Sequence, residues 1–241
     1  MRLIILAGAI AAALSGCVTV ETQGGAGGPA PRPAPVERGP DRISGSTAVA
    51  NFRAAAARVE PAAEAVCRQR APGINCDFLI RVDPDGSLPA NAYQSLSPTG
   101  RPLLTFTQNL IADARNQDEI AFVIGHESAH HIESHIARQR QSAAAGALVG
   151  GLIASVAGAD AGTVQQISRA GATVGARSYS KDHELEADAL GTIITQRAGY
   201  DPVRGAAFFT RIPDPGDRFL GSHPPNASRI ATVRRVATQG L

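Results

Sequence analysis

The stretch DEIAFVIGHESAHHIESHIAR, residues 118–138, combines helical apolar spacing with a cluster of titratable side chains. Its apolar residues recur at three- and four-residue intervals, which predicts a helix over this range. On a helix, residues four apart lie one turn along the axis and about 40° apart around it. His126 and His130 therefore present two imidazoles to one point, and Glu127 lies beside the first of them.

This arrangement is typical of a helical zinc site, in which the glutamate takes a proton from a metal-activated water. The alternative is a surface helix that carries the same residues by chance. The apolar run at 122–125 indicates instead that this part of the helix is buried, and buried imidazoles need polar partners. His131 and His135 lie about 140° and 180° around the helix from His126. We expect them to be solvated or to cap a helix.

A third ligand is expected from SKDHELEAD, residues 180–188, which has the pattern of a helix start with Ser180 as its N-cap. Glu184 and Asp188 are four residues apart and share a face of this helix. Glu184 can bind the metal, while Asp188 can accept a hydrogen bond from a ligand histidine and fix its tautomer. Glu186 points about 200° away from Glu184 and is a poor ligand candidate. An acidic, solvated helix face is the alternative.

Together these motifs resemble the gluzincin family of the HtpX heat-shock protease and the CAAX prenyl protease, in its single-domain periplasmic lipoprotein branch. The resemblance extends from about residue 44 to residue 238. It implies a zinc-dependent endopeptidase, with one zinc ion held by His126, His130 and Glu184 and with Glu127 as the general base. It also implies misfolded or misassembled cell-envelope proteins as substrates. A non-catalytic, zinc-stabilised chaperone or binding module is the alternative function.

Two further segments match the family pattern. Asn91, Ala92 and Tyr93 resemble the family's strand, along which an extended substrate could pair by β-addition. His223, with Arg229 downstream, matches a C-terminal motif that the resemblance places beside the metal. There both residues would stabilise the negative charge of a tetrahedral intermediate. The alternatives are an incidental surface turn, or His223 as a fourth zinc ligand that closes the resting site.

The N-terminus resembles a bacterial lipoprotein signal. Arg2 precedes an uncharged apolar run, residues 3–14, shorter than the roughly 20 residues that a helix needs to cross a bilayer. Small residues then precede Cys17, whose lipidation would anchor the chain to the membrane. An ordinary cleaved signal with an incidental cysteine is the alternative. Val18, where an Asp would resemble an inner-membrane retention signal, favours the periplasmic face of the outer membrane.

The remaining cysteines predict a disulfide. If Cys17 is lipidated, Cys67 and Cys76 form an even pair in an exported, oxidising compartment. The short loop between them contains a Pro-Gly pair that lets the chain turn back. Two free, buried thiols are the alternative.

The whole chain is expected to form an α+β, mainly helical, zincin-like domain with a small sheet. Its predicted parts are a signal peptide at 1–16, a lipidated cysteine with a Pro/Gly-rich linker at 17–43, and one metallopeptidase domain at 44–241. Helices are expected at 47–60 and 61–70, strands at 76–82, 91–96 and 103–107, and helices after residue 117. The net charge of +2 does not favour a nucleic-acid partner, and nothing sets the oligomeric state.

One uncharged stretch, residues 143–159, could be mistaken for a membrane span. Its large apolar residues form one stripe, whereas a spanning helix should be longer and apolar all round. We expect a helical lid or packing hairpin over the site, with membrane contact as the alternative.

Overall fold

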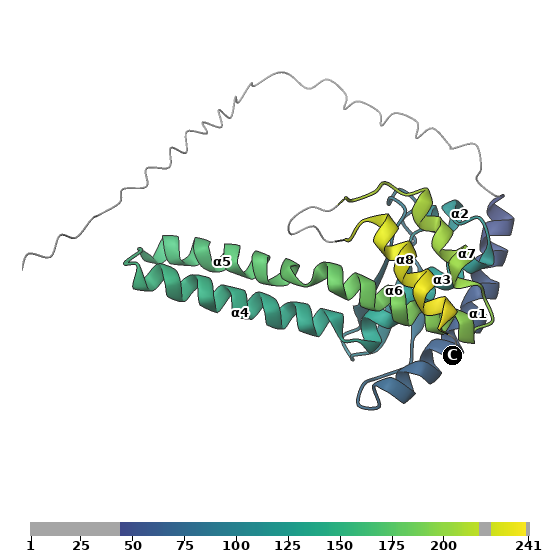
Figure 1. Ribbon diagram of the computed structural model, residues 1–241, viewed down its shortest axis with the longest axis horizontal. Coiled ribbons are helices and arrows are strands. Elements are labelled where there is room, and N and C mark those ends of the chain that lie inside the picture. The colour runs from purple at the N-terminus through teal and green to yellow at the C-terminus, as the bar shows by residue number, and fades with distance from the viewer. Residues whose placement is uncertain (1–43, 217–222, 240–241) are drawn as a thin grey trace, which may run out of the picture. The chain divides into compact units, whose positions relative to one another are not determined.

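The computed structural model describes residues 44–216 and 223–239, which are mostly helical with a small three-stranded sheet (Figure 1). The α+β prediction is confirmed, while the predicted signal peptide, Cys17 and linker lie outside the described residues. The elements are α1 (Gly45–Arg70), β1 (Leu79–Val82), β2 (Ala92–Leu96), β3 (Pro102–Phe106), α2 (Gln108–Asp113), α3 (Gln117–Ile132), α4 (His135–Val156), α5 (Ala161–Ser178), α6 (Ser180–Arg197), α7 (Pro202–Gly205), the 3-10 helix η1 (Ala206–Thr210) and α8 (Asn226–Thr238). Within 44–216 and 223–239, no helix is long and apolar enough to cross a membrane.

Helix α1 runs unbroken through Pro61, so the predicted division into two helices is wrong. Proline removes a backbone donor and frees the carbonyl four residues earlier, here that of Ala57. Both Pro61 and Ala57 are exposed, so water can satisfy that carbonyl. The opposite face of α1 is buried in the core through residues such as Ala55, Val59 and Val66.

The sheet has the strand order β1-β3-β2, with β1 parallel and β2 antiparallel to β3. All three expected strands are present, although β1 begins only at Leu79 and not at Cys76. Strand β2 lies at an edge of the sheet, in the register that pairs Tyr93 with Thr105 of β3. The sheet therefore has a backbone edge on the β2 side, next to the residues predicted to contact substrate.

Helices α3 and α6 cross in the core at a pair of glycines. A Cβ atom added to Gly125 would lie 2.8 Å from the carbonyl oxygen of Gly191, and one added to Gly191 would lie 2.9 Å from the backbone nitrogen of His126. Only glycine permits this approach at either position. The crossing brings the first turns of α6 beside the middle of α3, where the histidine motif lies.

The helix predicted over 118–138 is interrupted between α3 and α4. Ser134 takes a left-handed conformation with a φ of 55°, and its N–H donates to the carbonyl of His131. The chain then turns into α4 at His135. The angular positions computed for an unbroken helix therefore do not apply to His135.

The apolar stretch 143–159 belongs to α4 and the following turn, and α4 packs along α5 as a helical hairpin (Figure 1). The hairpin is present as expected, but none of the residues lining the cavity at the histidine motif comes from 143–159. The prediction that it covers the site is therefore wrong. Its stripe is exposed, with Leu148 74%, Leu152 66% and Val156 81% accessible.

A disulfide joins α1 to the segment before β1. The sulfur atoms of Cys67 and Cys76 lie 1.97 Å apart, and both residues are buried. The bond closes the loop at the end of α1, directly beside Asn75, whose carbonyl contacts His131.

Candidate metal centre

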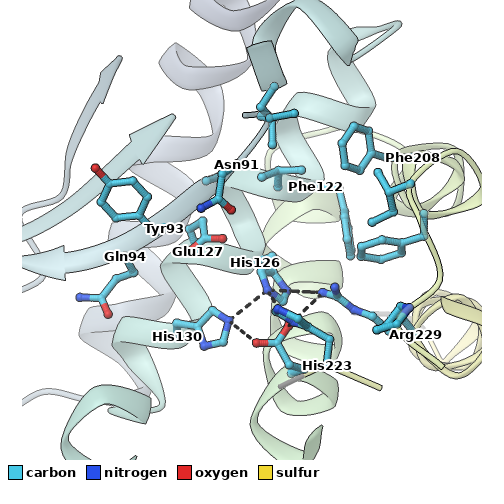
Figure 2. A pocket seen from close by; sticks show the side chains of 18 of the residues that line it. Asn91, Tyr93, Gln94, Phe122, His126, Glu127, His130, Phe208, His223 and Arg229 are labelled. Carbon is cyan, nitrogen blue, oxygen red and sulfur yellow. Dashed lines mark hydrogen bonds and ion pairs between the residues drawn. The ribbon is translucent and has the colours of Figure 1, made fainter. Parts of the chain in front are cut away.

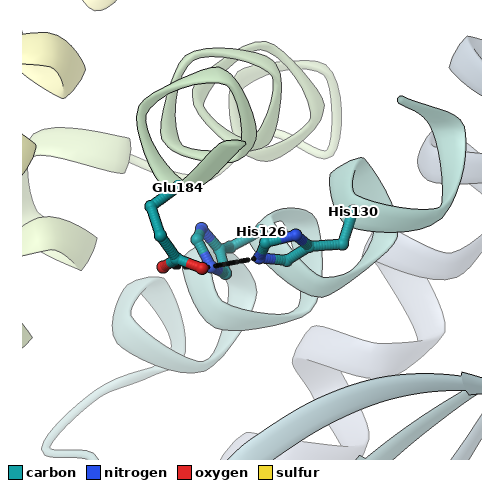
Figure 3. Close-up of side chains that lie close together, drawn as sticks. All are labelled: His126, His130 and Glu184. Atoms are coloured by element: carbon teal, nitrogen blue, oxygen red, sulfur yellow. Dashed lines mark hydrogen bonds and ion pairs between the residues drawn. The ribbon is translucent and has the colours of Figure 1, made fainter. Parts of the chain in front are cut away.

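Three side chains from two helices converge on one point. His126 and His130 project from α3, and Glu184 projects from the first turns of α6 (Figure 3). Nε2 of His126 lies 3.0 Å from Nε2 of His130. The Glu184 carboxylate lies 3.6 Å from the first of these nitrogens and 3.4 Å from the second.

These separations fit a tetrahedral zinc ion. Zinc bonds to nitrogen and oxygen are about 2.0–2.1 Å long, so tetrahedral geometry separates any two donors by about 3.3 Å. The three observed separations, 3.0, 3.4 and 3.6 Å, lie close to that value; the two to Glu184 end on Oε1 for His130 and on Oε2 for His126. The three residues are also the metal-binding group that the donor positions identify among the described residues. Two imidazoles and one carboxylate leave a fourth position for water or substrate, as a catalytic site requires.

The first histidine is fixed from behind by a buried carboxylate. Nδ1 of His126 lies 3.0 Å from Oδ1 of Asp188, which is fully buried. Arg229 grips the same carboxylate with two hydrogen bonds, from Nε at 2.8 Å and from Nη2 at 2.7 Å. Its guanidinium also lies over the Phe209 ring, 4.0 Å from the centroid. Asp188 can therefore accept a hydrogen bond from Nδ1 of His126, which leaves Nε2 directed toward His130 and Glu184.

The electrostatics favour ionised carboxylates. Burial would raise the pKa of Glu184, but hydrogen bonds from His130 and His223 and the charge of Arg229 hold that pKa well below its usual range. Burial likewise opposes ionisation of Asp188, but the hydrogen bonds from Arg229 and His126 lower its pKa. Both groups are thus negatively charged at neutral pH, which suits a metal ligand and its supporting carboxylate.

His135 was expected to be solvated or to cap a helix, and that expectation is wrong. Only 4% of the residue is exposed, and its Nδ1 lies 2.8 Å from Nδ1 of His130. Its Nε2 lies 3.0 Å from Oε2 of Glu186, and its ring stacks on His183 at 4.4 Å between centroids. Burial lowers the pKa of His135 to about 4, so the imidazole is neutral at neutral pH.

His131 is buried as well, against the same expectation. Its Nε2 lies 2.7 Å from the carbonyl oxygen of Asn75, and its ring packs edge-on against Phe78. It therefore faces the disulfide-closed loop, on the side of α3 away from the metal ligands. Burial is the main reason why its pKa is lowered.

Glu127 lines a cavity of about 710 Å³ that opens beside the three ligands (Figure 2). It follows His126 directly in α3 and is only 7% exposed. The cavity has an apolar wall that includes Phe122 and Phe208 and a polar wall from the β2 region. The polar side chains of that wall are those of Asn91, Tyr93 and Gln94, with Ala92 between them.

The C-terminal pair reaches the site in two different ways. Nδ1 of His223 lies 3.0 Å from Oε2 of Glu184, while half of the His223 side chain remains exposed. Arg229 is buried and mainly forms hydrogen bonds with Asp188.

At the start of α6, the predicted N-cap at Ser180 is wrong. Tyr179 occupies the N-cap position, and the Ser180 hydroxyl donates to the carbonyl of Ala176.

This combination of fold and site is that of a metallopeptidase, in which one helix supplies two histidines and a second helix supplies the acidic ligand. The sequence defines the family as well. Residues 57–237 match the model of peptidase family M48, and the chain therefore belongs to that family.

Named relatives of the chain are also peptidases. It is 33% identical over 144 residues to the putative beta-barrel assembly-enhancing protease of Vibrio cholerae, covering 54% of this chain and 30% of the relative. It is 32% identical over 138 residues to the beta-barrel assembly-enhancing protease of Escherichia coli, covering 52% and 28%. It is 27% identical over 173 residues to the mitochondrial metalloendopeptidase OMA1 of Saccharomyces cerevisiae, covering 68% and 47%. The chain thus spans less than a third of the length of these bacterial relatives.

Proposed function

We propose that this chain is a zinc metalloendopeptidase that cleaves misfolded or misassembled proteins of the bacterial cell envelope, as a member of the lipoprotein branch of its family. The observation that carries the proposal is the convergence of donor atoms from His126, His130 and Glu184, whose separations of 3.0–3.6 Å suit tetrahedral zinc. Glu127 lines the cavity directly beside these donor atoms. A structural zinc site would have no use for such a carboxylate.

When bound, zinc would supply Lewis-acid chemistry that polarises the scissile carbonyl and acidifies a water molecule. Glu127 would take the proton from this water and then pass it to the leaving amine. Asp188 would keep Nδ1 of His126 protonated, which leaves Nε2 free to face the metal.

Zinc content and proteolysis of an unfolded protein, measured with and without chelator, test this proposal. Glu127→Gln should keep zinc and the fold but lose activity, because it removes the base and no ligand. Glu184→Ala and His130→Ala should lose zinc itself. Glu64→Gln, a partly buried carboxylate of α1 in an ion pair with the exposed Arg68, is a matched control that should retain both properties.

The alternative, a zinc-stabilised chaperone, predicts a different outcome. Wild-type protein would then bind zinc and hold an unfolded protein without cleaving it, and Glu127→Gln would behave like wild type. Activity of Glu127→Gln equal to that of the wild type in a casein assay would overturn the proposed mechanism.

Substrate is proposed to bind along the β2 edge. Asn91, Ala92 and Tyr93 line the cavity, and β2, which begins at Ala92, pairs with β3 on one side and with no second strand of the described residues. An extended peptide could therefore add to this edge by main-chain hydrogen bonds and place a peptide bond beside Glu127. Replacing Ala92 by proline would remove the backbone donor at that position, and we expect it to raise the KM for a peptide substrate.

His223 is proposed to stabilise the negative charge of the tetrahedral intermediate, with Arg229 supporting the site through Asp188. The reach of His223 to Glu184 supports a position beside the reacting atoms. A positioned donor contributes roughly 100- to 1000-fold in rate. His223→Ala should therefore lower kcat and leave zinc affinity nearly unchanged. If His223 instead serves as an inhibitory fourth ligand, the same variant should become more active.

Lipidation of Cys17 is proposed to hold the domain at the periplasmic face of the outer membrane. The sequence before Cys17 supports this, and the names of the bacterial relatives refer to β-barrel assembly. Cys17→Ser should release the protein from the membrane fraction with its activity intact. A variant that still pellets with membranes after a salt wash would argue against the lipid as the anchor.

A further inference from the structure

The two ligand histidines are held from behind by different means. Nδ1 of His126 meets the carboxylate of Asp188 directly, at 3.0 Å. Nδ1 of His130 meets no carboxylate among the described residues, and lies instead 2.8 Å from Nδ1 of a third histidine, His135. Nε2 of His135 in turn lies 3.0 Å from the carboxylate of Glu186. Both histidines are thus linked to a carboxylate of α6, His126 directly to Asp188 and His130 through the imidazole of His135 to Glu186.

Metal binding by Nε2 of His130 would determine which ring nitrogen carries the proton in both His130 and His135. If Nε2 of His130 binds the metal, its Nδ1 carries the proton of the neutral ring. That N–H can donate only to an unprotonated Nδ1 of His135, so the proton of His135 must be on Nε2. The Nε2–H then donates to Glu186, which is an acceptor only. All the contacts are satisfied by this one set of tautomers.

We propose that His135 and Glu186 form a relay that positions the metal ligand His130. The inference rests on the proposed zinc site and extends it by two residues. His135 acts as a positioning residue, because its two ring nitrogens contact the ligand His130 and the carboxylate of Glu186. Its acceptor nitrogen fixes the rotation of the His130 ring, and the negative charge of Glu186 makes His130 a stronger donor to zinc.

At the surface end of the relay, Glu186 forms an ion pair with Arg138. Arg138 donates to both oxygens of Glu186, at 2.5 Å from Nη1 and 3.4 Å from Nη2. Glu186 is about two-fifths exposed, whereas His135 is almost fully buried. The two ring nitrogens of His135 therefore depend on His130 and Glu186 for their hydrogen bonds, and the ring stacks on that of His183.

The geometry of the backbone explains why a histidine can fill this position. The left-handed turn at Ser134 ends α3 and starts α4, so His135 returns toward His130 instead of continuing around the helix. Glu186 lies on α6, two residues beyond Glu184. The imidazole of His135 spans the distance from His130 to Glu186.

Zinc affinity, measured by competition with a chromophoric chelator on the full chain, tests the relay apart from activity. His135→Leu should weaken zinc binding by about 10- to 100-fold, the usual effect of losing such a partner. Glu186→Gln should also weaken zinc binding. The Glu186 side chain is partly exposed, so this substitution should not destabilise the fold. His135→Asn should restore much of the affinity, because its side-chain oxygen can accept from Nδ1 of His130.

His131→Leu is the matched control, since it removes a buried imidazole from the end of α3, four residues before His135, that contacts the carbonyl of Asn75 and not a metal ligand. It should lower the melting temperature and leave zinc affinity unchanged. Unchanged zinc affinity in Glu186→Gln, or equal losses in His135→Leu and His135→Asn, would overturn the relay. A wild-type chain that binds no zinc would instead refute the proposed function on which the relay rests.

Nitrogen chemical shifts of the imidazoles in the zinc-loaded protein give a second, variant-free measurement. The relay requires His130 to carry its proton on Nδ1 and His135 to carry its proton on Nε2. A proton on Nδ1 of His135 would exclude the hydrogen bond, because two N–H groups would then face each other.

Discussion

The α3–α6 pair and the α4–α5 hairpin both bring two helix backbones together through glycine, yet they place opposite kinds of side chain around the contact. In α3–α6, a Cβ atom on Gly125 would meet the carbonyl of Gly191 at 2.8 Å. In the hairpin, Gly146 and Gly171 are closer, with a Cβ atom on either meeting the carbonyl of the other at 2.1–2.2 Å. Close backbone approach is therefore common to both pairs.

The difference lies in what each pair buries. Helices α3 and α6 enclose charged groups, including the fully buried Asp188, and every buried side-chain polar atom among the described residues has a partner. The hairpin carries its large apolar residues on the outside, with Leu148 and Val156 mostly exposed. Buried charge is retained only with specific partners, and it is common at functional sites, whereas an exposed apolar stripe marks a surface. Glycine packing sets the distance between two helices, and the residues around the glycines determine whether the pair forms a buried site or an exposed surface.

The largest difference between the pairs should appear on placing one β-branched side chain in each contact. Gly191→Val should destabilise the domain by more than about 3 kcal/mol and abolish zinc binding, because α3 and α6 must separate. Gly171→Val meets a closer contact, but we expect its damage to stay within the hairpin and to leave zinc binding intact. Thermal unfolding followed by circular dichroism, together with zinc content, measures both. Loss of zinc in Gly171→Val would show that the hairpin supports the site.

A smaller difference is expected from removing one arginine in each region. Arg229→Ala leaves Asp188 buried without its two hydrogen bonds, and breaking such a buried pair costs about 3–5 kcal/mol. Arg177→Ala, at an exposed position near the end of α5, should change stability by less than about 0.5 kcal/mol. Urea unfolding of the two variants gives both values. Similar midpoints for Arg229→Ala and wild type would mean that Asp188 finds another partner or takes up a proton.

The sequence predicted the parts of the site that depend on local helical spacing. The four-residue interval places His126 and His130 on one face, and the same interval links Glu184 and Asp188. Both intervals lie inside unbroken helices, so the predicted faces apply. The edge strand and the mainly helical fold were also predictable, because apolar runs, turns and helical periodicity alternate clearly along the chain.

What the sequence missed depends on breaks in helices and on tertiary packing. Ser134 adopts a left-handed conformation without the glycine that normally marks one, so nothing signalled the turn that brings His135 to His130. The continuation of α1 through Pro61 depends on the exposure of that face, which is a tertiary property. Helices α4 and α5 pack through glycines, and the prediction of a lid over the site did not use those contacts.

The smallest effect on stability is expected from the exposed stripe itself. Leu148→Gln combined with Leu152→Gln should change the free energy of unfolding by less than about 0.5 kcal/mol per site, because both side chains are mostly in water already. Ile124→Ala in α3, a fully buried position, should cost about 2–5 kcal/mol and gives the scale for comparison. Zinc affinity should be unchanged in the hairpin variant, whereas binding of a hydrophobic fluorescent dye should fall, since the stripe is the exposed apolar surface that the dye contacts. A large loss of stability in the double variant would mean that the stripe is covered in the folded protein, and the contrast between the two helix pairs would then be wrong.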